Sequence, residues 1–76
     1  MGHYYIPVMK TEVEFKITFW DMNGNCDFEF EDEKPIAVQK AQALFDQGIY
    51  KSVLVEKTTY RGSDFDTVAV LSLGEE

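Results

Sequence analysis

Apolar and polar side chains alternate along two neighbouring stretches in the first half of the chain. Between Glu12 and Trp20 the apolar residues stand mainly at odd positions, and between Cys26 and Glu31 they stand at even positions. A period of two is typical of a strand that buries one of its faces. We therefore predict two strands, one over each stretch.

An Asn-Gly pair lies between these two stretches, at positions 23 and 24. Asn-Gly is the strongest short signal for a hairpin, because a type I′ turn needs a positive φ at both central residues. A two-residue turn there would place Phe19 opposite Phe28 and Ile17 opposite Phe30. The predicted hairpin therefore has one apolar face, with its acidic side chains pointing outward.

The segment after the hairpin carries the signals of one helix. Acidic residues followed by Pro35 suit the first turn, because proline needs no amide hydrogen there and the helix dipole favours negative charge. Apolar residues then recur at helical spacing, and Gly48 is a natural C-terminal stop. We predict a helix over residues 35–47.

Two further stretches, residues 50–60 and 64–73, are rich in β-branched and aromatic residues, and Arg61-Gly62-Ser63 between them has turn chemistry. A two-residue loop would set Val55 against Val70 and Leu54 against Leu71. The sequence leaves open which of these pairs is buried.

The predicted order is ββαββ, an α+β fold with a four-stranded, mainly antiparallel sheet and one helix packed on one face. Residues 1–9 form an extended lead-in, residues 10–73 the single domain and residues 74–76 an acidic end. One helix covers only one face of such a sheet, so the other face is either solvated or an interface.

Composition limits the class of protein. The 76 residues include 14 acidic and 7 basic side chains, for a net charge of −7, and 45% are hydrophobic. This is one small domain and not a disordered acidic tail. The single cysteine excludes an internal disulfide, and no membrane span or signal peptide is recognisable. We expect a cytoplasmic protein.

Few residues could carry catalysis. His3 is the only histidine, Cys26 is expected on the inward face, and no glycine-rich phosphate loop is present. Paired carboxylates need a cleft, which a four-stranded sheet with one helix hardly offers. We predict that the chain is not an enzyme and needs no cofactor.

The loop that begins at Asp21 resembles the start of an EF-hand, with oxygen-bearing side chains also at Asn23 and Asn25. Its glycine stands at the fourth position instead of the sixth, however, and residues 27–31 alternate as a strand. We therefore favour a plain hairpin over a calcium site and predict no metal.

The acidic surplus is concentrated. Six acids and no base lie between Asp21 and Glu33, and the predicted register places three of them beside Glu12 and Glu14 on the outward face. Too few basic residues are available for direct binding to nucleic acid. An acidic face around an exposed tryptophan suits a basic protein partner instead, although acids also serve solubility. The candidate partner-binding residues are Glu12, Glu14, Trp20, Asp27, Glu29 and Glu31.

The ββαββ order, the length, the acidic surplus and the absence of catalytic residues resemble small phage and mobile-element proteins, including anti-CRISPR inhibitors. The resemblance covers the architecture of residues 10–73 and no specific motif. It implies an inhibitor whose acidic surface mimics nucleic-acid charge, and it assigns no residue.

Two functional hypotheses follow. The first is a non-enzymatic module that binds a basic protein surface, as such an inhibitor would. The alternative is a self-associating structural protein, a homodimer paired through the open sheet face or through the edge strand Asp64 to Leu73. Neither hypothesis involves a membrane.

Overall fold

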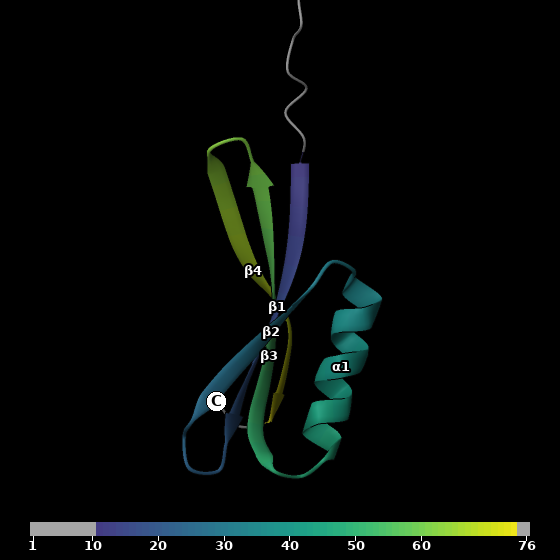
Figure 1. Ribbon diagram of the computed structural model, residues 1–76, viewed down its shortest axis with the longest axis vertical. Helices are drawn as coiled ribbons and strands as arrows, with labels where there is room; N and C mark the ends of the chain where they lie inside the picture. The colour runs from purple at the N-terminus through teal and green to yellow at the C-terminus, as the bar shows by residue number, and fades with distance from the viewer. Residues whose placement is uncertain (1–10, 75–76) are drawn as a thin grey trace, which may run out of the picture.

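The computed structural model describes residues 11–74, which form one antiparallel sheet and one helix (Figure 1). The elements are β1 (Thr11–Asp21), β2 (Cys26–Glu31), α1 (Lys34–Asp46), β3 (Tyr50–Arg61) and β4 (Asp64–Gly74). The strands lie in the order β2-β1-β3-β4, and each pairs antiparallel with its neighbours. The predicted α+β fold and element order are confirmed.

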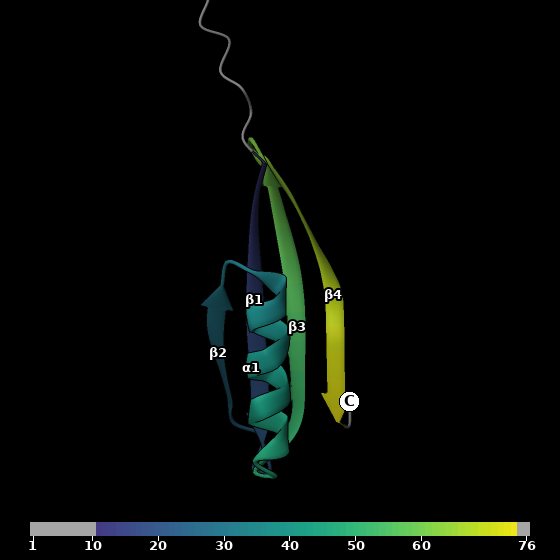
Figure 2. The ribbon, with the colours of Figure 1, turned by 90° about the vertical axis from the view of Figure 1, so that its right-hand side faces the viewer.

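The core lies between the two central strands and the helix, which crosses over β1 and β3 (Figure 2). Ile17, Val53 and Val55 are at most 1% exposed. The helix contributes Ala37 and Ala41, whose small side chains allow its backbone to approach the sheet. The helix spans only part of the strand length, so β1, β3 and β4 continue beyond its first turn (Figure 1).

The helix begins and ends close to the predicted positions. Pro35 lies in its first turn, and Glu33 precedes it in an extended conformation that starts the helix without a side-chain cap. Gly48 follows with a φ of +75°, and its amide donates to the Phe45 carbonyl. This left-handed residue turns the chain toward β3, as glycine does at many helix ends.

In the β3–β4 hairpin neither of the two expected pairs forms, because Val55 lies opposite Leu71 and Leu54 lies opposite Ser72. Gly62 has a φ of +63° and Ser63 does not have a positive φ, which is the pattern of a two-residue II′ turn. The expected register holds from the turn to Glu56, after which a β-bulge shifts it and Val55 lies opposite Leu71. The bulge brings leucines of β4 to the helix side, where they pack against the core.

The β1–β2 hairpin differs from the prediction by one residue. Thr18 lies opposite Phe28 and Ile17 opposite Glu29, so the predicted pairing of Phe19 with Phe28 is wrong. The loop contains three residues, not two. The Gly24 amide donates to the Asp21 carbonyl, and the Asp21 amide donates to the Asn25 carbonyl. This is a type I turn followed by a glycine at a φ of +90°.

The side chain of Asp21 explains why this loop has three residues. Its Oδ1 accepts hydrogen bonds from the backbone amides of Asn23, at 2.8 Å, and Asn25, at 3.0 Å. Partial desolvation opposes a lowered pKa, but these hydrogen bonds outweigh it and hold the pKa of Asp21 below its usual value. The carboxylate thus stabilises the longer loop, and Asn-Gly serves a different turn from the one predicted.

A shift of one residue moves every side chain of β2 to the other face of the sheet. Phe28 and Phe30, predicted to be buried, lie on the face opposite the helix and are 50% and 51% exposed. Cys26, predicted to face inward, is exposed as well. The acidic residues of β2 point to the helix side instead of outward.

The predicted lead-in at residues 1–9 and most of the acidic end lie outside the described residues. Within residues 11–74, no helix is long and apolar enough to cross a membrane.

Candidate functional site: the open aromatic face

The face of the sheet opposite the helix, which we call the open face, has no layer over it in residues 11–74 (Figure 2). Its side chains come from alternate positions on all four strands. They include Glu12, Glu14, Lys16, Thr18, Trp20, Phe28, Phe30, Leu54, Glu56, Thr58, Tyr60, Phe65 and Thr67.

Aromatic rings dominate this face. Phe28 and Phe30 meet edge to face, with ring centroids 5.4 Å apart, on β2. Tyr60 and Phe65 lie opposite each other on β3 and β4, with ring centroids 6.3 Å apart. Phe65 is 67% exposed. Large apolar side chains gathered on one exposed surface are a mark of an interaction site.

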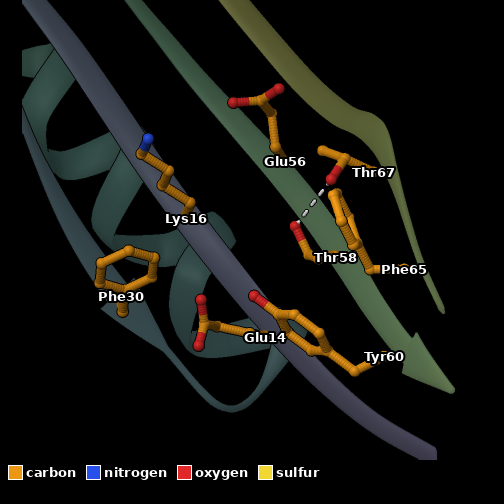
Figure 3. A pocket seen from close by; sticks show the side chains of 8 residues that line it. All are labelled: Glu14, Lys16, Phe30, Glu56, Thr58, Tyr60, Phe65 and Thr67. Atoms are coloured by element: carbon orange, nitrogen blue, oxygen red, sulfur yellow. Dashed lines mark hydrogen bonds between the residues drawn. The ribbon is translucent and has the colours of Figure 1, made fainter. Parts of the chain in front are cut away.

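A shallow hollow of about 490 Å³ lies between the two aromatic pairs (Figure 3). Its floor is formed by the short side chains of Thr58 and Thr67, whose hydroxyl oxygens are 3.0 Å apart in a hydrogen bond. The rings of Phe30, Tyr60 and Phe65 border it. The hollow exists because the two threonines are shorter than Glu56 and Tyr60 on β3 and Phe65 on β4.

Two carboxylates border the same hollow. Glu14 lies opposite Thr58, and Glu56 lies opposite Lys16. Among residues 11–74 neither glutamate forms an ion pair. The Lys16 ammonium lies over the ring of Phe28, 4.6 Å from its centroid, although Glu56 stands on the adjacent strand. The hollow is thus bordered by two carboxylates and one ammonium, and its net charge is negative.

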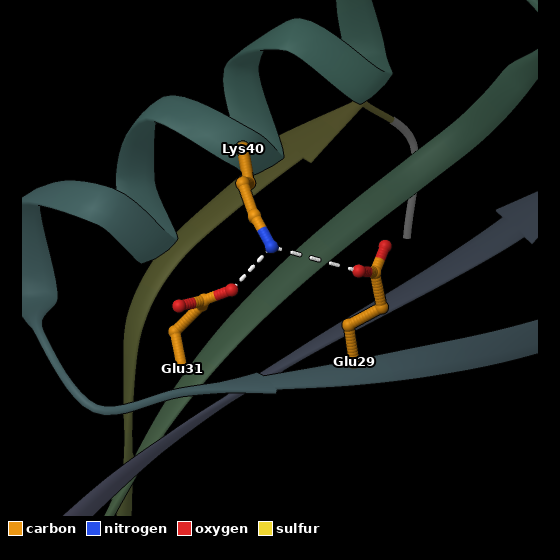
Figure 4. Close-up of polar contacts among 3 residues, drawn as sticks. All are labelled: Glu29, Glu31 and Lys40. Atoms are coloured by element: carbon orange, nitrogen blue, oxygen red, sulfur yellow. Dashed lines mark hydrogen bonds and ion pairs between the residues drawn. The ribbon is translucent and has the colours of Figure 1, made fainter.

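The acids of β2 have a different environment on the helix side (Figure 4). Lys40 of α1 pairs with Glu31 and lies 3.7 Å from Glu29. The hydrogen bond to Glu31 raises the pKa of Lys40, against the effect of partial desolvation. One cation thus offsets part of the negative charge, and these carboxylates take part in holding the helix beside β2.

The predicted partner-binding residues are consequently divided between the two faces. Glu12, Glu14 and Trp20 lie on the open face, as predicted, but Trp20 is half-buried and stands near the opposite end of β1 from Glu12. Asp27, Glu29 and Glu31 do not join them, because the three-residue loop turns them to the helix side. The predicted row of five acids on one surface is therefore wrong.

Sequence reasoning placed Trp20 on this surface but missed most of its other aromatic residues. Phe28 and Phe30 were assigned to the core by the wrong register. Tyr60 and Phe65 could have been found, since a two-residue turn at Gly62 and Ser63 already places them opposite each other. Glu56 then follows by alternation along the same strand.

The loop at Asp21 is a hairpin whose carboxylate accepts hydrogen bonds from the loop itself. In the described part of the chain, no group of three or more His, Cys, Asp or Glu side chains is placed to hold a metal ion. Within residues 11–74 the open face brings together exposed rings, carboxylates without an ion-pair partner and hydroxyl groups. Comparisons with protein-family models, with curated proteins and with solved structures found no match for the chain.

Proposed function

We propose that the protein is a non-enzymatic interaction module that binds a basic protein surface through its open face. The observation that carries this proposal is the combination of exposed aromatic rings with Glu14 and Glu56, which have no ion-pair partner in residues 11–74. Aromatic rings supply contact area and attract cations, and carboxylates pair with lysine and arginine.

The charge of the chain supports a basic partner. With a net charge of −7, the protein attracts positively charged surfaces at long range and accelerates their encounter. On the open face itself, three carboxylates and one ammonium leave a net negative charge. Mimicry of nucleic acid by a regular row of acids loses its geometric basis, however, because the acids are divided between two faces.

Self-association receives less support from the same surface. Two copies placed face to face would bring like charges together around the hollow. Both sheet edges carry features that prevent pairing with another sheet. β2 is six residues long with three acids, and β4 begins with two aspartates and contains a bulge. A heterologous basic partner therefore fits better than a second copy.

The proposal can be tested by capturing partners from a lysate with the immobilised full chain and with two charge-matched variants. Glu14→Gln with Glu56→Gln removes charge from the open face, whereas Glu29→Gln with Glu33→Gln removes the same charge elsewhere. We expect basic proteins to be captured by the wild type and by the second variant, but not by the first. Elution by 1 M salt, where charges are screened beyond roughly 3 Å, should release them.

Two outcomes would overturn the proposal. One is a captured set that both variants retain equally, which would place binding away from the hollow. The other is capture that survives high salt and consists of acidic or neutral proteins. Circular dichroism of both variants provides the folding control, since all four positions are at least partly exposed.

A further inference from the structure

The hollow on the open face has the chemistry of a site for one arginine side chain. We propose that an arginine of the basic partner inserts its guanidinium group above Thr58 and Thr67, between the carboxylates of Glu14 and Glu56. This inference rests on the proposed function and specifies which side chain the open face recognises.

Side chains that lie opposite one another on neighbouring strands form rows across the sheet, and these rows define the shape of the site. The row that contains Thr58 and Thr67 is low over β3 and β4, because both side chains are short, and Glu14 stands in the same row on β1. On one side the next row carries Phe30, Lys16 and Glu56. On the other side the rings of Tyr60 and Phe65 stand at 40° to each other. A flat group can enter between these rows and stack on an aromatic ring.

The polar groups at the hollow match a guanidinium better than an ammonium. Arginine presents five N–H donors in one plane and stacks on aromatic rings, whereas lysine is a strongly hydrated point charge. The hollow offers acceptor oxygens from two carboxylates and two hydroxyl groups around one floor. A branched, planar donor can present N–H groups to more than one of these acceptors.

Lys16 shows that this face attracts cations and that the hollow is not filled by the neighbouring lysine. Its ammonium stacks over Phe28 and forms no ion pair with Glu56 on the adjacent strand. The carboxylate of Glu56 therefore remains available to a cation from outside. An incoming arginine adds a second cation to the hollow, on the side of Thr58 and away from Lys16.

The test measures the affinity of the full chain for fluorescent hexaarginine, hexalysine and hexaglutamate peptides by anisotropy at low salt. We expect hexaarginine to bind at least about tenfold more tightly than hexalysine, and hexaglutamate not to bind. Glu14→Gln with Glu56→Gln should weaken hexaarginine binding by at least about tenfold, since two charge-assisted contacts are lost. Glu29→Gln with Glu33→Gln, which removes equal charge, should change it by less than about threefold.

A second variant tests the stacking surface. Phe65→Leu keeps an apolar side chain but removes the ring, and it should reduce the preference for hexaarginine over hexalysine. Equal affinity for the two cationic peptides, without dependence on Glu14 and Glu56, would overturn the arginine site. If that affinity also depended on exposed rings of the open face, the basic-partner proposal would stand. Failure of both cationic peptides to bind would contradict both.

Discussion

Ile17 of β1 lies directly opposite Glu29 of β2, so a fully buried apolar side chain and a carboxylate share the helix side of the sheet. This pairing follows from the three-residue loop that Asp21 stabilises. It sends the phenylalanines of β2 to the open face and leaves the acids of β2 near Lys40. One residue of loop length thereby determines what each surface can bind.

The register of the β1–β2 hairpin can be tested by measuring how much stability is lost when a phenylalanine of β2 is replaced. Phe30 is 51% exposed, so Phe30→Ala should lower the free energy of unfolding by less than about 1.5 kcal/mol. The alternative register would bury this ring, and its loss would then cost about 3–5 kcal/mol. Urea denaturation of the two proteins measures the difference.

Replacing a core residue on the other face of the same hairpin should cost much more stability. Ile17 is 0% exposed and packs between the central strands and the helix. Ile17→Ala should lower the free energy of unfolding by about 2–5 kcal/mol, because it removes buried apolar groups and leaves a cavity. Val13→Ala on the same strand, at a position 36% exposed, is the control. Similar losses for the two variants, measured by urea denaturation, would place the core elsewhere.

Acid titration tests the role of Asp21. Its pKa is lower in the folded chain than the usual value of 3.8, so its ionised form favours folding. The contribution is complete above the unfolded pKa and is lost as the pH falls through the folded pKa. Asp21→Asn should therefore be less stable than the wild type at pH 7, and the gap should narrow below about pH 4. Thermal melts across pH 2–7 measure it, and a gap that stays constant would contradict the role of the charge.

The oligomeric state separates the two functional hypotheses. Because β2 and β4 carry acids at the sheet edges and β4 is bulged, we expect the chain to sediment as a monomer at micromolar concentration. Sedimentation velocity at low and high salt measures this. A dimer that strengthens in high salt would instead support apolar self-association through the open face, since salt screens the repulsion between acidic copies.

Much of the fold could be predicted because local signals agreed with the tertiary structure. Pro35 and Gly48 bound the helix within one or two residues, and Gly62 marked the second turn. The register of the first hairpin could not be predicted from Asn-Gly alone, because both a two-residue turn and a type I turn followed by glycine use this pair. The deciding contacts come from Asp21, two positions before Asn23.

The binding surface was predicted only in part for the same reason. Alternation shows which residues of a strand share a face, but it does not show which face of β2 the helix covers. Glu12, Glu14 and Trp20 were assigned correctly to the open face because the apolar residues of β1 stand at the odd positions, and Ile17 among them is buried under the helix. The wrong loop length placed the acids of β2 on the open face and its phenylalanines on the helix side, which is the reverse of the structure.

Binding of basic partners to the open face can be observed residue by residue, by NMR of the full chain during titration with hexalysine. We expect salt-sensitive shifts in the ring protons of Phe30, Tyr60 and Phe65, while the methyl groups of Ile36 on the helix remain unchanged. Shifts concentrated around Lys40 and Glu29, with the three rings unaffected, would contradict it.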